Sequence, residues 1–417
     1  MRWLERRGSA DATPRNRAHR ERAAIPGHRV LAVGAYERDN FGDLLFLEVT
    51  EALCAGASVT ASSVIAADMT REFGRAITTY AHELRAHTFD VVWSVGGELG
   101  RVNTSAALKY SLPPAAFASL TSLDETARRP LVEQLTGMPH QDLVYVPDLT
   151  QFSLNSGARQ VIHSAGLSGI STLRPEQQER IVARLSRAAS ITVRDNESGA
   201  VLAERGITAD VSPDVVHALP LLFPHVLEDR HDSICFHAAA TCMQRAGTER
   251  VGEALAALAA AADTDVLLFV AGTAFGHDSV ERYQEVVRYL AAKHPRVGVR
   301  ISGSRDPMDL AKEVAGSRIW IGTSLHGRII AASAGVPRVS LSKAIDRPDP
   351  AEKTARYSRT WDGEMPYATP LNDVVNAYTA AVAEETSARG VETGRDLALQ
   401  ALVTGRRAAG RALPLRG

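Results

Sequence analysis

The segment Ile319–Lys343, IWIGTSLHGRIIAASAGVPRVSLSK, decides the fold of this chain. Residues 319–321 are an apolar run typical of a buried strand, and residues 329–334 supply the apolar face of a helix. Gly335 ends that helix before Pro337, after which a second strand begins. Strand, turn, helix, turn and strand in this order predict one unit of a parallel α/β sheet.

Polar side chains gather where the first strand of this segment ends and its helix begins. Open α/β sheets bind ligands at the carboxyl ends of their strands, and free N–H groups at a helix N-terminus favour an anion. The helix dipole disfavours a proton on His326, but a bound anion would raise the pKa of this imidazole and make it a proton donor. His326 is therefore the candidate acid of an enzyme with an anionic substrate. The candidate ligand-binding residues around it are Thr323, Ser324, Gly327 and Arg328.

The same alternation of apolar strands and amphipathic helices extends over most of the 417 residues. Near the start, RVLAVGAY at residues 29–36 predicts a buried strand, and helices are expected over residues 44–54 and 76–87. With 45% hydrophobic residues the chain can bury two cores, so we expect two doubly wound α/β domains facing a cleft. The expected division is a disordered basic arm over residues 1–27, an N-terminal domain over 28–222 with an excursion at 101–156, a C-terminal domain over 230–370, and a helix and tail over 371–417.

Composition narrows the classes of function. The net charge is −1, which predicts no general attraction to nucleic acid or to an anionic membrane surface. Cys54, Cys235 and Cys242 are odd in number and lack paired metal spacing, which indicates a reducing, cytoplasmic compartment. No apolar run approaches 18 residues, so no membrane span is expected. The arginine-rich residues 1–28 lack the apolar core of a secretion signal, and they either contact membrane phosphates peripherally or form a solvated tail.

Three further clusters are predicted at carboxyl ends of strands. In GAYERDNFGD, residues 34–43, glycine permits close backbone approach, while Asn40, Gly42 and Asp43 either contact a ligand or begin a helix by capping it. The glycines lack the G-x-G-x-x-G spacing of a dinucleotide site. The second cluster, after a strand, is either a ligand contact or a tight turn. It consists of Gly96, Gly97 and Glu98.

Arg194 is the third cluster's candidate for binding a phosphate or carboxylate. The alternative is a structural ion pair with Asp195 or Glu197. His163, His237 and the pair His277-Asp278 are lesser candidates, for which a structural role is favoured. No H-E-x-x-H, G-x-S-x-G or Walker motif occurs and no carboxylate cluster suggests a metal, so no metal or cofactor is expected.

Taken together, these clusters resemble the polysaccharide pyruvyl transferase family. They follow the family order over about residues 30–345. The matching segments are GAYERDNFGD, VGGE, VRDNES with the later ERGI and SPDVV, the pair His277-Asp278, and SLHGRIIAASAGVPRVSLSK.

The resemblance implies a GT-B-like fold of two Rossmann-like domains and a transferase activity. Such enzymes move the enolpyruvyl unit of phosphoenolpyruvate onto two hydroxyls of one sugar, giving a cyclic ketal and phosphate. His326 matches the family's proposed acid, and Arg194 matches the arginine that would hold phosphate or carboxylate. The turn with Asn40 and Asp43 would face the acceptor, a sugar or a lipid-linked glycan.

Two departures from the family pattern keep alternatives open. The family usually has arginine two residues before its histidine, where this chain has Ser324, and Arg328 is the candidate replacement. The third glycine of the family's cluster is Glu98, whose carboxylate suits a hydroxyl-bearing acceptor better than an anionic donor. The alternatives are a GT-B glycosyltransferase or another group transferase with a different anionic donor, and a relative without catalytic activity. The acceptor and the oligomeric state are not predicted.

Overall fold

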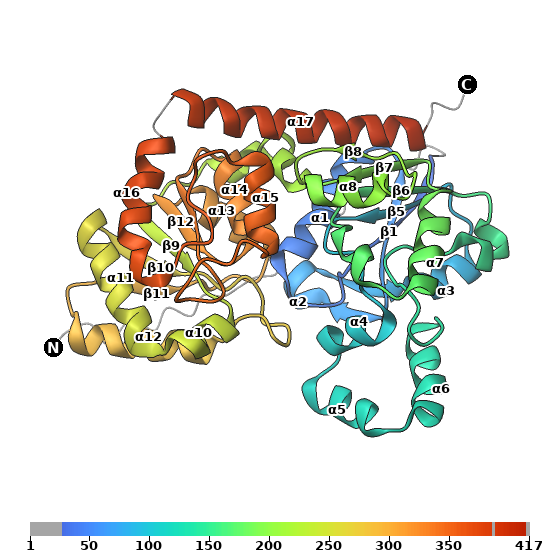
Figure 1. Ribbon diagram of the computed structural model, residues 1–417, viewed down its shortest axis with the longest axis horizontal. Coiled ribbons are helices and arrows are strands. Elements are labelled where there is room, and N and C mark those ends of the chain that lie inside the picture. Colours follow the sequence, from blue (N-terminus) through green and yellow to red (C-terminus); the bar gives the residue numbers. More distant parts are fainter. Residues whose placement is uncertain (1–26, 386–387, 414–417) are drawn as a thin grey trace.

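The computed structural model describes residues 27–385 and 388–413, which form two α/β domains side by side (Figure 1). The predicted arm over residues 1–27 lies outside the described residues apart from Gly27. Within the described part of the chain, one sheet has eight strands and the other has five. The expected fold class, α/β with two Rossmann-like domains, is confirmed.

The N-terminal sheet has the strand order β3-β4-β2-β1-β5-β6-β7-β8. Its strands are β1 (Arg29–Val33), β2 (Ser58–Ser63), β3 (Ala67–Met69), β4 (Arg75–Thr79), β5 (Val91–Val95), β6 (Arg159–Ala165), β7 (Ser190–Val193) and β8 (Asp210–Val211). All neighbours pair in parallel except β3 and β4. The central strands β1 and β5 are almost entirely buried, as expected for parallel strands with helices on both faces.

The helices of this domain connect successive strands. They are α1 (Phe41–Leu53), α2 (Thr70–Phe73), α3 (Tyr80–Ala86), α4 (Thr104–Ser111), α5 (Pro114–Ser122), α6 (Glu125–Thr136), α7 (Pro175–Leu185) and α8 (Asn196–Ala203). Short 3₁₀ turns lie at Leu149–Gln151, Ser153–Asn155 and Ser168–Thr172. Helices α5 and α6 project from the body of the domain (Figure 1). Three short helices lead into the second domain: η4 (Val215–Ala218), α9 (Leu219–Leu222) and η5 (Pro224–Leu227).

The expected helix over residues 76–87 is wrong in its first part. Residues Arg75–Thr79 form β4, between β2 and β3, and helix α3 begins only at Tyr80. Three successive β-branched residues favour a strand here, and the neighbouring strands supply its hydrogen bonds. Thr79 then caps α3 by accepting a hydrogen bond from the backbone N–H of His82.

The C-terminal sheet is fully parallel, in the order β11-β10-β9-β12-β13. Its strands are β9 (Ser233–His237), β10 (Asp265–Leu268), β11 (Val299–Ile301), β12 (Ile319–Gly322) and β13 (Arg338–Ser340). Its helices are α10 (Ala240–Ala246), α11 (Thr248–Ala262), α12 (Val280–Lys293), α13 (Pro307–Ala315), α14 (Leu325–Ser333) and α15 (Lys353–Trp361). The strand–helix–strand unit predicted for Ile319–Lys343 is thus present as β12, α14 and β13.

The chain ends with α16 (Val374–Glu385), after a 3₁₀ turn at Leu371–Asp373, and α17 (Ala388–Ala412). Helix α17 runs along the top of both domains in Figure 1, and it contacts η4, β6 and β7 of the first and α14 of the second. No described helix is both long enough and apolar enough to cross a bilayer.

A continuous apolar core joins the two domains. Phe41 at the start of α1 packs edge-on against Phe269, with ring centroids 5.2 Å apart. The same core includes Val215 from the N-terminal domain and Trp320 and Ile329 from the C-terminal domain. Apolar burial across this boundary brings the carboxyl ends of the two sheets together.

Candidate functional site

The first turn of α14 meets two charged residues of the N-terminal domain. His326 is the second residue of α14, and its Nε2 lies 4.0 Å from Oδ2 of Asp214. The same oxygen accepts a hydrogen bond from Nη1 of Arg194 at 3.5 Å. An imidazole of the C-terminal domain therefore meets a charged pair of the N-terminal domain.

His326 sits in a pocket whose walls come from α1. The ring of Phe46 meets the imidazole edge-on, with centroids 4.8 Å apart. A Cβ at position 42 would lie 1.8 Å from Nδ1 of His326, so Gly42 makes room for this ring. Nε2 of His326 is buried and has no hydrogen-bond partner among the described residues. One ring nitrogen of this buried imidazole is therefore without a partner among the described residues.

The electrostatic surroundings keep His326 neutral at pH 7. Burial lowers the pKa of this imidazole to about 3. The nearby charge of Asp43 opposes the shift, whereas Arg194 and Lys353 reinforce it. A proton can therefore occupy His326 at neutral pH only when negative charge enters the site.

Asp214 was not predicted as a functional residue. It follows β8 and caps η4 by accepting a hydrogen bond from the backbone N–H of Val216, an ordinary role for aspartate. Its own N–H donates to the Tyr357 hydroxyl at 3.0 Å. Burial raises the pKa of Asp214 to about 6, although the Arg194 charge opposes the shift. Only the approach of α14 distinguishes this aspartate from a capping residue.

Arg194 is buried at the end of β7, where the sequence places an anion-binding residue. Neither predicted structural ion pair forms. Asp195 caps α8 by accepting a hydrogen bond from Ser198 N–H, and Glu197 pairs with Arg359 at 2.9 Å. Arg194 instead faces Asp214 and the histidine pocket.

Helix α15 contacts the N-terminal domain through Trp361 and Arg356, and it begins with Lys353, a cation near this site. Trp361 Nε1 donates to the backbone carbonyl of Arg194 at 2.7 Å, and Arg356 lies 3.9 Å from the Glu98 carboxylate. Lys353, the first residue of α15, forms no hydrogen bond or ion pair with the described residues. Crowding by neighbouring protein groups reduces the hydration of this ammonium and lowers its pKa to about 8, and repulsion from Lys343 and Arg194 adds to the shift, while the residue stays exposed to solvent.

Sequence reasoning missed Lys353 because it lies in a segment expected to be a polar loop. The chain has only five lysines, and two of them, Lys343 and Lys353, lie near the site. That rarity is the one signal in the sequence that could have pointed to them.

The turn before α1 both caps the helix and borders the pocket. Asn40 accepts a hydrogen bond from Gly42 N–H at 3.3 Å, so the predicted capping role is present. Its Nδ2 donates to Asp43 Oδ2 at 2.8 Å, and Arg38 donates to the same oxygen at 3.1 Å. Asp43 is thereby held where its charge acts on the histidine.

The glycines after β5 form a tight turn that positions Glu98. Gly96 and Gly97 have φ values of +62° and +70°, and a Cβ at position 96 would lie 2.1 Å from the Phe46 ring. The Glu98 carboxylate accepts a hydrogen bond from Gly169 N–H at 3.4 Å and remains partly exposed. Both the turn and a carboxylate beside Arg356 are therefore present.

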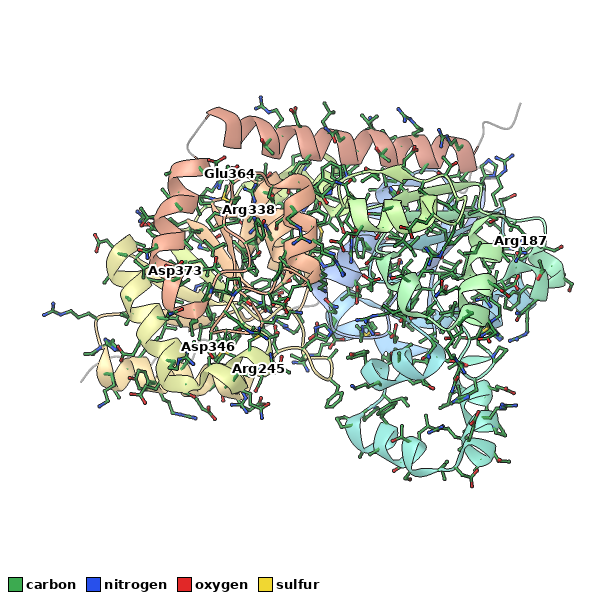
Figure 2. All side chains as sticks on the ribbon, viewed as in Figure 1. Arg187, Arg245, Arg338, Asp346, Glu364 and Asp373 are labelled. Carbon is green, nitrogen blue, oxygen red and sulfur yellow. The ribbon has the colours of Figure 1, made fainter. Side chains whose placement is uncertain are left out.

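Arg328 is placed away from the pocket. It is completely buried, and its Nε donates to Asp362 Oδ2 at 2.5 Å while Nη1 donates to the Ser340 hydroxyl at 3.0 Å. Arg338, buried inside the C-terminal domain (Figure 2), pairs with the other oxygen of Asp362 at 3.1 Å. The guanidinium of Arg328 is thus occupied within the protein, and we assign it a structural role.

The remaining predicted residues shape the first turn of α14. Ser324 caps the helix by accepting a hydrogen bond from Gly327 N–H at 3.5 Å. A Cβ at position 327 would lie 2.1 Å from the Trp320 ring, so Gly327 permits the close approach of helix and strand. Thr323 is buried and its hydroxyl contacts His237.

Among the described residues, no three His, Cys, Asp or Glu side chains are grouped so that they could hold a metal ion. Cys54, Cys235 and Cys242 are free thiols and are buried. Burial raises the pKa of each of these thiols. They are therefore unreactive core residues.

The polysaccharide pyruvyl transferase family model matches residues 134–342, half of the chain. No curated protein matches the sequence. A solved UDP-GlcNAc 2-epimerase from Neisseria meningitidis, bound to UDP-GlcNAc, is 12% identical with a TM-score of 0.48, covering 91% of this chain and 97% of that chain. E. coli heptosyltransferase WaaC with ADP-2-deoxy-2-fluoro heptose is 12% identical with a TM-score of 0.43, covering 86% and 100%. Spinosyn rhamnosyltransferase SpnG is 13% identical with a TM-score of 0.40, covering 90% and 96%.

Proposed function

The chain belongs to the polysaccharide pyruvyl transferase family, and from this premise we propose that it transfers pyruvate from phosphoenolpyruvate to two hydroxyls of one sugar. The acceptor is a glycan or a glycan precursor, and the products are a cyclic ketal and phosphate. The observation that carries the proposal is the unpartnered Nε2 of His326, which lies 4.0 Å from Asp214 and within the electrostatic influence of the cations Arg194 and Lys353.

The donor is an anion at both of its ends. Arg194 at the end of β7 and Lys353 at the start of α15 supply positive charge for its phosphate and carboxylate, and the N-terminus of α14 adds free N–H groups. Lys353 provides the charge that is absent at Ser324. The Lys353 ammonium and the Arg194 guanidinium repel each other, and an anion bound between them would relieve that repulsion, which supports this assignment.

His326 is the proposed acid. Donor charge beside the imidazole raises its pKa, and the protonated ring delivers its proton to C3 of the enol. The C2=C3 electron pair forms the new C–H bond, and C2 becomes an oxocarbenium-like centre stabilised by its ester oxygen. Asp214 faces the imidazolium that precedes this transfer and stabilises it.

Two hydroxyls of the acceptor then add to C2. The first hydroxyl forms a C–O bond and loses its proton, after which the C2–O bond to phosphate breaks. The second hydroxyl attacks the same carbon and loses its proton. Of the two protons released by the hydroxyls, one leaves with phosphate and the other restores the protonated form of His326. Asn40, Asp43 and Glu98, at strand ends of the N-terminal domain, are the proposed contacts for these hydroxyls. Phosphoenolpyruvate is the co-substrate, and this chemistry needs no further cofactor.

The buried free thiols fit a reducing compartment, so we place the reaction in the cytoplasm. A lipid-linked acceptor would bring the enzyme to the membrane surface without a spanning helix.

The deciding experiment measures phosphate release from phosphoenolpyruvate with a panel of glycoside acceptors. His326→Gln should lower kcat on the order of 10²- to 10⁴-fold, the usual contribution of general acid catalysis. His163→Gln, which removes a buried imidazole on β6, is the matched control and should keep kcat per folded enzyme. Stabilisation by a nucleoside diphosphate, with none by phosphoenolpyruvate, would instead favour a glycosyltransferase.

A further inference from the structure

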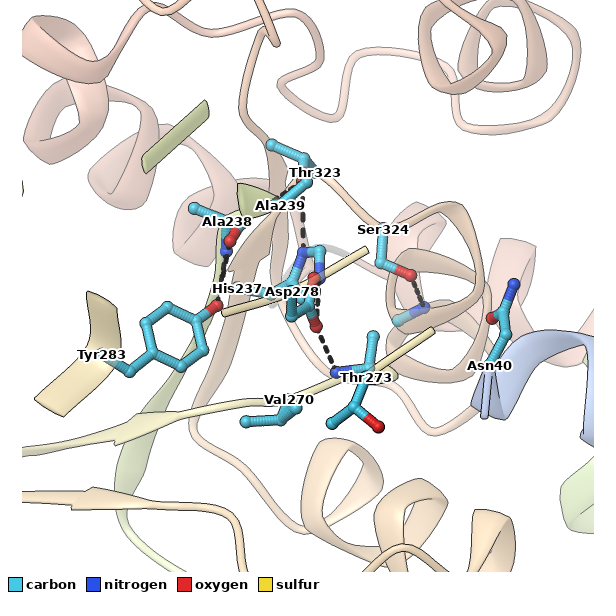
Figure 3. A network of polar contacts seen from close by, with 12 residues as sticks. Asn40, His237, Ala238, Ala239, Val270, Thr273, Asp278, Tyr283, Thr323 and Ser324 are labelled. Carbon is cyan, nitrogen blue, oxygen red and sulfur yellow. Dashed lines mark hydrogen bonds and ion pairs between the residues drawn. The ribbon is translucent and has the colours of Figure 1, made fainter. Parts of the chain in front are cut away.

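A hydrogen-bonded network of three buried side chains, Asp278, His237 and Thr323, joins the ends of β9 and β12 (Figure 3). His237 is the last residue of β9, and its Nε2 lies 3.0 and 3.2 Å from the two oxygens of Asp278. Its Nδ1 lies 3.2 Å from the hydroxyl of Thr323, directly after β12. The imidazole also stacks on Trp320, with ring centroids 5.9 Å apart.

The neighbouring backbone groups set the direction of these hydrogen bonds. Ala239 N–H donates to the Thr323 hydroxyl oxygen at 3.2 Å, and Ala271 N–H donates to Asp278 Oδ2 at 2.6 Å. The Thr323 hydroxyl therefore has its own proton left to donate, and Nδ1 of His237 is the acceptor within reach. Nε2 then carries the ring proton and donates it to Asp278. In this arrangement every side chain of the network has its hydrogen bonds satisfied.

One end of the network lies at the first turn of α14. Thr323 immediately precedes Ser324, the residue that caps this helix, and His326 follows two residues later. A shift of the Thr323 hydroxyl therefore moves the backbone from which the proposed acid projects.

The other end of the network, at Asp278, lies at the boundary between the domains. Ala271, bonded to Asp278, accepts a hydrogen bond through its carbonyl from Phe41 N–H at 2.9 Å. Thr273, two residues on, donates from its N–H and its hydroxyl to Asp39 Oδ2 at 2.9 and 2.7 Å. These contacts join the loop before α12 to the start of α1, whose second residue, Gly42, packs on the His326 ring.

Burial excludes a direct role in the chemical reaction for the three side chains of this network. The side chains of His237 and Asp278 are only 4% and 2% exposed, and Thr323 is buried. A buried carboxylate is costly unless its hydrogen bonds are satisfied, and a fully satisfied buried network favours one geometry over others.

We propose that Asp278, His237 and Thr323 position the first turn of α14, and so His326, relative to the N-terminal domain. They are positioning residues, because none of them reaches the pocket itself. A misplacement of about 1 Å at a reacting group lowers turnover on the order of 10²-fold, so this role has kinetic consequences. The kinetic part rests on the proposed pyruvyl transfer.

The first test compares Thr323→Val with Thr323→Ser. Valine keeps the shape and removes the hydroxyl, so kcat should fall on the order of tenfold to a hundredfold with the KM for phosphoenolpyruvate within about twofold. Serine keeps the hydroxyl and should restore kcat to within about threefold. Tyr283→Phe is the matched control, because it removes a buried hydroxyl that bonds both backbone groups of Ala238, also at the end of β9, without touching Thr323. Turnover is expressed per donor-binding site by calorimetric titration.

The second readout does not depend on activity. The NMR signal of the Cε1–H proton of His326 is assigned by its loss in His326→Gln. Its chemical shift should change in Thr323→Val and stay the same in Tyr283→Phe. Asp39→Asn should shift it as well. If the wild type releases no phosphate, the proposed function fails while this signal still decides the positioning role. The inference is overturned if the signal is unmoved in Thr323→Val, or if Thr323→Val and Tyr283→Phe lower kcat per site equally.

Discussion

Donor binding should be coupled to uptake of one proton by His326. In the empty site the pKa of this imidazole is about 3, so protonating it for catalysis near pH 7 requires a rise of about four units, or about 5 kcal/mol. A negative charge about 5 Å away contributes about 3 kcal/mol at an effective dielectric constant of about 20. Two charges of a bound phosphoenolpyruvate therefore suffice. The same calculation predicts that an uncharged analogue leaves the histidine neutral.

Isothermal titration of phosphoenolpyruvate in buffers of different ionisation enthalpy measures this uptake directly. At pH 7 the wild type should take up about one proton more than His326→Gln, because any proton exchanged by the phosphate is common to both proteins. Since the protonated form binds the donor more tightly, affinity should weaken as pH rises through the pKa of the complex. Equal proton numbers in the two proteins would refute the assignment of His326 as the acid. A lower number in the wild type would refute it equally.

The placements of individual side chains give four further predictions. Lys353→Met should weaken phosphoenolpyruvate binding on the order of tenfold to a hundredfold in a titration, as expected for a lost charge-assisted contact, with little change in unfolding temperature. Arg328→Met should cost about 3–5 kcal/mol in denaturant unfolding, because it removes one of the two guanidinium partners of the buried Asp362 carboxylate. Lower stability in Lys353→Met together with weaker binding in Arg328→Met would reverse the two roles. Because the pKa of Asp214 is raised to about 6, its folded form binds a proton between about pH 4 and pH 6 that the unfolded form has lost, so wild-type stability should fall with rising pH relative to Asp214→Asn, by up to about 3 kcal/mol. If the free energies of urea unfolding of the wild type and of Asp214→Asn changed equally between pH 4 and pH 7, the raised pKa of Asp214 would be contradicted. Gly42→Ala should displace His326, the proposed acid, lowering kcat more than about tenfold and stability by about 1–3 kcal/mol, whereas Gly157→Ala, where a Cβ meets open space, should change neither.

Arg328 and Lys353 show that nearness in the sequence is a poor guide to nearness at the site. Two residues after His326, Arg328 is the nearest cation along the chain, yet it points into the core and pairs with Asp362. Lys353 is 27 residues from the histidine, and α15 returns it to the site. Residues two apart on a helix face different directions, so nearness in sequence misled.

The sequence by itself determined the local units of this protein. Alternating apolar strands and helices predicted the α/β fold, and the segment around β12 and α14 placed His326 at a strand–helix junction because periodicity and capping depend on neighbouring residues. Strand β4 was missed because the strands that supply its hydrogen bonds, β2 and β3, lie outside the segment itself.

Only the tertiary structure decided which charges meet. Asp214 looks like any capping aspartate until α14 brings His326 to within 4.0 Å of it, and Lys353 looks like a loop residue until α15 docks on the N-terminal domain. Burial then changes the pKa values of His326 and Asp214, and burial is a property of the packed fold that no local sequence pattern encodes.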